Sequence, residues 1–229
     1  SAVLLNIRSL GFVKSIKPVG IMKKLLNDSV NDITSFSKAN KSAVYIDVKE
    51  EEYGLSFNQI KMLNGHILHK YGFRGNGILI AVFDAGFKKI DQLSAFDSLR
   101  MENRILSEWN FVTNNDSVYY FSSHGTNVLS TMAAITKGEI TGTAPKANYA
   151  LLVTEDVGSE LIIEEDNWVA AIEFADSICV DVVNSSLGYT TFDDTSMNHT
   201  YADMDGYTTI ITKAADMAAQ NGMLVVSSA

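Results

Sequence analysis

The chain has 229 residues, of which 46% are hydrophobic and 20% are charged, so it can bury a large core and is not intrinsically disordered. Lys and Arg total 18 and Asp and Glu total 27, a formal net charge of −9 that disfavours nucleic acid as a partner. The longest apolar runs are far too short to span a bilayer, and the one cysteine, Cys179, has no partner for an intrachain disulfide.

Residues 1–48 predict a small unit of helix and strand. Apolar residues at helical spacing predict a short helix over residues 3–10, followed by an extended segment at Phe12–Val19. Residues 27–42 are rich in Asn, Ser, Asp and Lys, which is typical of a linker or an exposed loop. A further short strand is predicted at Ala43–Val48, and the acidic run Glu50–Glu52 is expected to be a solvated surface.

The pattern changes at Ser56, which is a plausible N-cap for one amphipathic helix. The helix is predicted from a single apolar stripe, formed by Ile60, Leu63, Ile67, Leu68 and Tyr71. Three glycines then end it, at positions 72, 75 and 77. Phosphate-binding loops need such glycines after a strand and leading into a helix, whereas these precede a strand, so a nucleotide-binding domain is disfavoured.

Beyond these glycines, apolar strands alternate with helices. Strands are predicted at Ile78–Phe83, Ile105–Phe111, Tyr149–Thr154, Val180–Asn184 and Met223–Ser227. Helices are predicted at His124–Ile135, Glu164–Ser177 and Thr208–Gln220, the second with Trp168, Ala171, Ile172 and Ala175 on one face. Strands that are apolar on both faces and joined by helices indicate an α/β fold in three layers with a mainly parallel sheet.

Two polar residues stand where such a sheet carries chemistry. Asp84 directly follows the strand Ile78–Phe83, at the carboxyl edge where ligands gather, and His124 opens a helix. An Asp in that position often only caps a turn, and a His at a helix start is often ordinary surface. However, the positive end of the helix dipole favours a neutral imidazole that can accept a proton, and an Asp at its other nitrogen would fix the tautomer.

Five motifs in order, covering residues 53–229, make the chain resemble the subtilisin-like serine proteases (subtilases). The motifs are Asp84-Ala85-Gly86, His124-Gly125-Thr126, Gly142-Thr143-Ala144-Pro145, Asn184-Ser185-Ser186-Leu187-Gly188 and the strand Met223–Ala229. The resemblance implies a serine endopeptidase with Asp84 orienting His124 and His124 as the general base. It also implies that an extended polypeptide substrate is held between two strands, Gly158-Ser159-Glu160 and Ser186-Leu187-Gly188.

The chain departs from the family pattern in two informative places. The nucleophilic serine and the oxyanion asparagine are absent, and the chain stops at Ala229 directly after a core-type strand. We therefore expect a truncated or cleaved chain that is inactive alone, because losing these groups costs several orders of magnitude in rate. The loop Thr136–Glu139 lacks the calcium-binding pattern of many relatives, so no metal is predicted there, and no cofactor is implied.

The resemblance also suggests an organisation in two parts. Residues 1–48 resemble the end of a subtilase propeptide, which makes the chain a zymogen segment, and residues 49–229 resemble the N-terminal portion of the catalytic domain. Its own propeptide or a separate C-terminal half would then be partners. A secreted or otherwise extracytoplasmic location is implied by the family alone.

Acidic side chains crowd one stretch between the predicted strand and helix, at Glu155, Asp156, Glu160, Glu164, Glu165 and Asp166. Acids are favoured in a first helical turn, which accounts for several of them. A sharper hypothesis is that Glu160 or a neighbour selects basic residues in the substrate. The main alternative to an enzyme is a pseudoprotease, a binding module that keeps the fold without the nucleophile.

Overall fold

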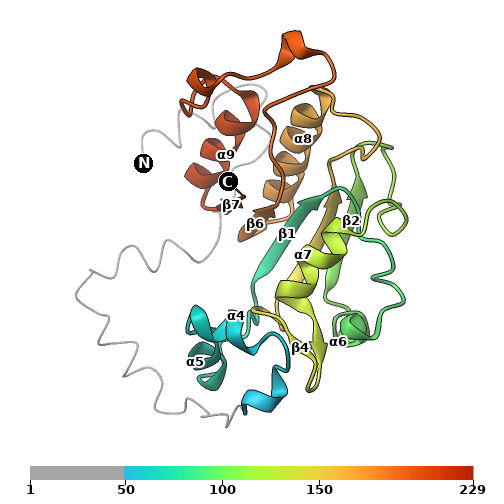
Figure 1. Cartoon of the computed structure of the whole chain (residues 1–229), viewed down its shortest axis with the longest axis vertical. Helices are drawn as coiled ribbons and strands as arrows, with labels where there is room; N and C mark the ends of the chain where they lie inside the picture. The colour runs from blue at the N-terminus through green and yellow to red at the C-terminus, as the bar shows by residue number, and fades with distance from the viewer. Residues whose placement is uncertain (1–48, 229) are drawn as a thin grey trace, which may run out of the picture.

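The computed structural model describes residues 49–228 (Figure 1). The elements predicted within residues 1–48, and the propeptide-like organisation assigned to them, lie outside the described residues. Among the described residues, no helix combines the length and apolar character needed to cross a membrane.

A five-stranded parallel sheet forms the centre of the molecule, in the order β2-β5-β1-β6-β7. Its strands are β1 (Leu79–Asp84), β2 (Ile105–Asn110), β5 (Asn148–Val153), β6 (Val182–Ser185) and β7 (Leu224–Ser227). The strand β1 lies in the middle, between β5 and β6, and five of its six residues are buried. The five strands predicted between residues 78 and 227, and their parallel arrangement, are confirmed.

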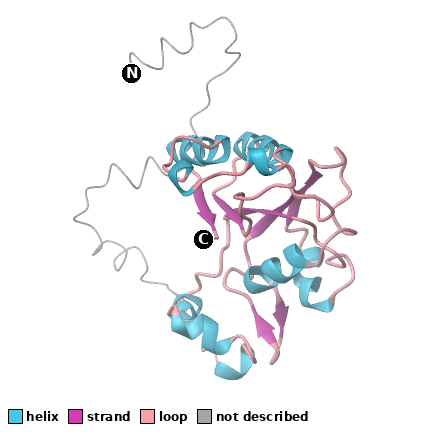
Figure 2. Ribbon diagram, turned by 45° about the horizontal axis from the view of Figure 1, so that its top comes forward, coloured by secondary structure: helices cyan, strands magenta, loops and turns pink. Residues whose placement is uncertain are grey.

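Helices cover both faces of the sheet, which gives the predicted three layers (Figure 2). Ile80 and Val82 of β1 pack with Leu129 of α7 (His124–Ala133) on one face. The alternate residues Ala81 and Phe83 pack on the other face with α8 (Ile163–Ser177) and α9 (Ile210–Asn221). This alternation follows from the two-residue period of a strand, and Trp168, Ala171, Ile172 and Ala175 of α8 are buried as predicted.

Shorter elements complete the description. An antiparallel pair, β3 (Ile135–Thr136) and β4 (Ile140–Thr141), follows α7. The remaining helices are η1 (Glu50–Glu52), α4 (Phe57–Met62), α5 (Gly65–Lys70), η2 (Ser94–Phe96), α6 (Asp97–Met101), η3 (Thr195–Met197) and η4 (Tyr201–Asp203).

The prediction of one buried-stripe helix after Ser56 is wrong. Two short helices, α4 and α5, replace it, because Asn64 adopts a left-handed backbone with φ of 58° that interrupts the α-helix. The predicted stripe is thereby divided: Ile60 is buried, whereas Leu63 is 70% exposed. Ser56 makes no side-chain cap; its hydroxyl instead lies within hydrogen-bond distance of the carbonyls of Tyr53 and Thr141 and accepts from the N–H of Thr141, which ties α4 to β4.

Candidate active site

Asp84 ends the central strand at the carboxyl edge of the sheet. It pairs in register with Val153 of β5, and its carbonyl accepts a hydrogen bond of 3.1 Å from the N–H of Thr154. The neighbouring strand β6 ends at the same edge, since its Ser185 pairs with Phe83. The loops that follow β1, β5 and β6 therefore start side by side, which is the usual place for a ligand site in a parallel sheet.

The structure brings His124 into contact with Asp84, as predicted. The Nδ1 atom of the His124 ring lies 2.8 Å from Oδ1 and 2.9 Å from Oδ2 of Asp84. The Asp84 side chain is fully buried, whereas the His124 side chain is 52% exposed. Because an ionised carboxylate only accepts hydrogen bonds, Nδ1 carries the proton, and the Nε2 lone pair is left available to a reacting group.

Two glycines permit this contact. A Cβ atom on Gly125, the second residue of α7, would lie 2.5 Å from the carbonyl oxygen of Gly86 and 2.9 Å from Cγ of Asp84. Gly86 itself has φ of 141°, and a Cβ there would lie 2.6 Å from the N atom of Ser122. The first turn of α7 can therefore approach the end of β1 only because both residues lack side chains.

The environment of Asp84 opposes its charge in part. Burial raises the pKa of this carboxyl above its ordinary value, while hydrogen bonds from the His124 ring and from the N–H of Ala85 act in the opposite direction. A buried carboxylate held by two donors is fixed in place, so the imidazole that it contacts is held in one orientation.

Ser186-Leu187-Gly188 follows β6 directly at the same edge, but it is not part of a strand. The preceding Ser185 is buried, and its Oγ accepts a hydrogen bond of 3.0 Å from the indole N–H of Trp168. Within residues 49–228, no main-chain N–H of Ser186, Leu187 or Gly188 donates to another residue. The segment therefore has main-chain N–H groups available to a ligand, and the residue that precedes it is held in place by burial and a hydrogen bond.

The prediction that Gly158-Ser159-Glu160 forms a strand is wrong. Residues 157–158 form a turn, and no strand is assigned between β5 and α8. Asp156 organises this turn, because its side chain accepts from the N–H of Gly158 at 3.0 Å and its carbonyl from the N–H of Ser159 at 3.2 Å. An Asp that bonds the main chain two residues further on is a common cause of such turns.

Several acidic residues near this turn are buried, which the sequence did not reveal. Glu164 and Glu165 do lie in the first turn of α8, as expected, but they are only 1% and 2% exposed. Glu164 accepts from the N–H of Asp156, and Glu165 contacts the ring of His199 at 2.5 Å. Burial raises the pKa of Glu155 to about 7, and the negative charges of Glu164, Glu160 and Asp84 add to this rise.

The described residues do not complete a catalytic triad. Within residues 49–228, no serine hydroxyl bonds the His124 ring, and Ser122 Oγ accepts only from the main-chain N–H of His124. The same part of the chain contains no group of three His, Cys, Asp or Glu side chains arranged to hold a metal ion. The arrangement can therefore orient an imidazole and accept a proton.

Comparison with known proteins identifies relatives for most of the chain. Residues 75–229 match the model of the subtilase family. Subtilisin E of Bacillus subtilis (strain 168) is 31% identical over 158 residues, which cover 66% of this chain and 38% of that protein. Subtilisin of Bacillus pumilus is 34% identical over 140 residues, which cover 59% of this chain and 44% of that protein. The chain thus spans less than half the length of these relatives.

A solved structure has a similar fold. MycP1 from Mycobacterium smegmatis superposes with a TM-score of 0.50 at 15% identity, over 81% of this chain and 47% of that one. At this identity the likeness concerns the fold alone. It agrees with the three-layer arrangement of helices around a parallel sheet described above.

Proposed function

The chain belongs to the subtilase family, and from this premise we propose that it carries the Asp–His part of a serine endopeptidase active site. The contact between Asp84 and His124 carries the proposal. A buried carboxylate on Nδ1 and a free, half-exposed Nε2 are what a general base for a serine nucleophile requires. The nucleophilic serine and the oxyanion donors come from outside residues 49–228.

In the proposed reaction, His124 moves one proton in each half. As the serine Oγ attacks the carbonyl carbon of the peptide bond, its proton passes to Nε2 of His124. The C–N bond then breaks, and that proton passes to the leaving amine, which leaves an acyl-enzyme. Water repeats the sequence: its proton goes to Nε2, its oxygen bonds the acyl carbon, and the serine leaves with the proton. Asp84 stabilises the imidazolium in both halves.

The substrate is a polypeptide that lies between residues 158–160 and Ser186–Gly188. Both segments border the edge of the sheet at which Asp84 ends, which supports their role as the two walls of a peptide groove. An extended peptide gains affinity from main-chain hydrogen bonds, and these do not depend on its sequence. The organisation into a partial propeptide (residues 1–48) and the N-terminal portion of a catalytic domain (49–229) belongs to the same proposal, as does an extracytoplasmic location.

The test uses a longer polypeptide in which this chain is followed by the serine-bearing part of a catalytic domain. We expect it to hydrolyse peptides and to react at one serine with a fluorophosphonate, and the His124→Ala variant to lose both reactions. Residues 49–229 by themselves should not react. Peptide hydrolysis that is insensitive to His124→Ala would overturn the proposal, and peptide binding without labelling would instead identify a pseudoprotease.

A further inference from the structure

Asp193, in the loop after β6, forms hydrogen bonds with both main-chain groups of Glu160. The N–H of Asp193 donates to the carbonyl of Glu160 at 2.8 Å, and the N–H of Glu160 donates to Oδ2 of Asp193 at 3.3 Å. Both main-chain groups of Glu160 are therefore bonded by a residue 33 positions further along the chain.

The loop that carries Asp193, residues 189–199, is firmly attached to the same stretch of chain. The hydroxyl of Tyr189 donates to the Glu155 carboxylate, and the His199 ring contacts the buried Glu165. Inside the loop, Phe192 is 6% exposed and packs edge-on against His199, with ring centroids 5.6 Å apart. The attachment of the loop to residues 155–165 is thus independent of the Asp193–Glu160 pair and holds Asp193 in position.

The hydrogen bonds that residues 158–160 already make limit which of their main-chain groups are available to a bound peptide. On the 158–160 side, the N–H of Gly158 is bonded to Asp156 and both groups of Glu160 are bonded to Asp193. On the opposite side, the main-chain N–H groups of Ser186–Gly188 have no partner among residues 49–228.

We propose that Asp193 is a specificity-determining residue that leaves the peptide groove with one pairing edge. The substrate pairs with Ser186–Gly188, and Asp193 takes the place that a substrate backbone would occupy on the 158–160 side. This inference rests on the proposed peptidase function and goes beyond it. Its consequence is that lengthening a substrate toward residue 160 gains no main-chain hydrogen bonds, so selection depends on the residues close to the scissile bond.

The experiment compares substrates of increasing length in the complete protease. A single-residue ester, which does not extend to residue 160, serves as the reference substrate, and peptides lengthened one residue at a time on the acyl side supply the series. We expect kcat/KM of the wild type to rise less than about twofold over the last steps of the series. In Asp193→Ala, which frees the N–H of Glu160, the same steps should raise kcat/KM about fivefold, the worth of one hydrogen bond.

Asp193→Asn is the matched control, because its amide oxygen can still accept from Glu160 while the charge is lost. It should behave as the wild type, which separates the hydrogen bond from a charge effect on basic substrates. Amide hydrogen exchange gives a second measurement, and exchange at Glu160 should be faster in Asp193→Ala than in Asp193→Asn.

The possible failures are distinguishable. A wild type that does not hydrolyse the reference ester refutes the peptidase function, and with it this inference. The wild type could hydrolyse the ester normally and yet gain as much kcat/KM from longer peptides as Asp193→Ala does. That result would refute the role of Asp193 and leave the peptidase function intact. Weaker binding of long peptides by Asp193→Ala would also overturn it, because Asp193 would then support the groove.

Discussion

Two histidines of this protein have opposite hydrogen-bonding environments: His124 lies at the carboxyl edge of the parallel sheet, and His69 lies within α5. The His124 ring has a buried Asp84 carboxylate on Nδ1 and is 52% exposed on its other side. The His69 residue is 1% exposed, and both of its ring nitrogens are bonded, Nδ1 to the hydroxyl of Tyr53 at 2.9 Å and Nε2 to the carbonyl of Thr143 at 2.9 Å.

The difference shows what makes a histidine available for chemistry. A carbonyl can only accept, so Nε2 of His69 carries the proton and Nδ1 accepts from Tyr53. Neither nitrogen is then free to take a proton from a substrate. Burial lowers the pKa of His69, and the nearby Arg74 and His66 contribute in the same direction, against the Thr143 hydrogen bond. His69 is thus a structural residue that joins α5 to the loop after β4.

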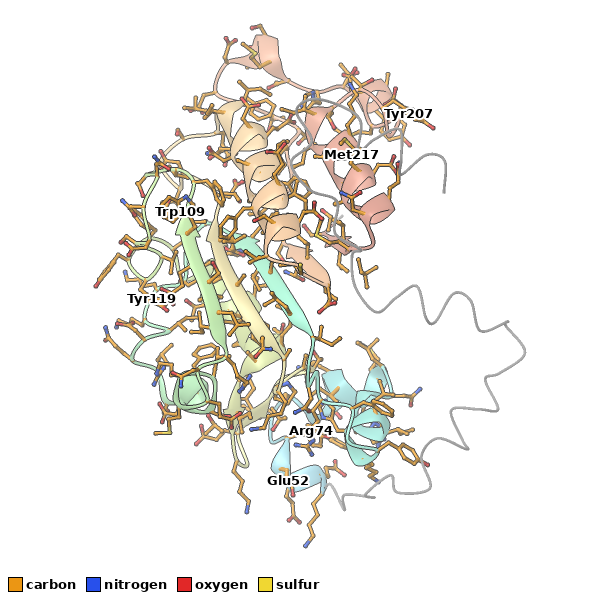
Figure 3. The ribbon with its side chains drawn as sticks, turned by 180° about the vertical axis from the view of Figure 1, so that it is seen from behind. Glu52, Arg74, Trp109, Tyr119, Tyr207 and Met217 are labelled. Carbon is orange, nitrogen blue, oxygen red and sulfur yellow. The ribbon has the colours of Figure 1, made fainter. Side chains whose placement is uncertain are left out.

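The surroundings of the two histidines also differ in charge. Figure 3 shows Glu52 and Arg74 at the end of the molecule that carries α4 and α5. At the sheet edge, by contrast, the negative charges of Glu164, Glu160 and Asp84 all act to raise the pKa of Glu155. The site is therefore electronegative, while the structural end mixes both signs.

Asp84→Asn should have the largest effect on the catalytic rate, because it removes the group that makes His124 different from His69. The amide favours the tautomer with the proton on Nε2, which cannot accept one from a serine. In the longer, serine-bearing polypeptide proposed above, we expect kcat to fall roughly 10³- to 10⁴-fold. Thermal unfolding should change little, because burial already disfavours the charge of Asp84. Retention of full activity would show that Asp84 does not orient the base.

Gly125→Ala tests whether close approach of α7 sustains the contact. The new Cβ would lie within 3 Å of Asp84 and Gly86, so His124 should move away from its carboxylate. A displacement of about 1 Å is expected to reduce kcat about 10²-fold. Steady-state kinetics, together with the NMR signal of the Nδ1 proton, would check this. An unchanged signal would mean that the helix start can adjust without cost.

His69→Ala should affect stability and not catalysis. It leaves a cavity and removes the partner of the buried Tyr53 hydroxyl, so the free energy of unfolding should fall by about 2–4 kcal/mol. His66→Ala, a matched control on the same helix, should cost less than about 1 kcal/mol, because His66 is only partly buried. Denaturant titration measures both, and kcat of the folded variants should equal that of the wild type.

The contributions of Glu155 and of His69 to the stability of the fold should depend on pH in opposite directions. The folded-state pKa of Glu155 is raised from 4.5 to about 7, so its contribution to stability is present below pH 4.5 and is lost as the pH rises toward 7. His69 has a lowered folded-state pKa, so its contribution is lost as the pH falls below its ordinary value of 6.5.

Glu155→Gln isolates the first effect, because the amide oxygen still accepts from Tyr189 without ionising. The variant should be more stable than the wild type at pH 8 by about 1–3 kcal/mol and nearly equal to it at pH 4.5. Unfolding measured at both pH values checks this. A difference that does not change with pH would show that the Glu155 carboxyl is not the titrating group.

Local patterns in the sequence account for the sheet and for the central contact of the site. Each strand of the parallel sheet is an apolar run such as Ile78–Phe83, and burial on both faces requires such runs. Asp84 and His124 were identified from their positions at a strand end and a helix start, and sheet topology then brings those positions together.

Contacts between residues that are distant in the chain could not be predicted from local sequence patterns. The break at Asn64 looks like continuous helix in sequence, because a stripe pattern does not record a single left-handed residue. The acidic residues after β5 are typical of a first helical turn in sequence, yet Glu165 is buried and contacts the ring of His199, 34 positions away. The triplet 158–160 was expected to be a strand, but Asp156 and Asp193 bond its main chain in a turn.

The sequence by itself determined the order of strands and helices, the parallel sheet and the two residues at its edge, because these follow from hydrophobic period and from glycines that permit close packing. The tertiary structure alone decided which histidine keeps a free nitrogen, which acids are buried and which backbone edge stays open. Those properties depend on which groups meet across the fold, and a hydrogen bond between residues more than 30 positions apart leaves no local pattern in the chain.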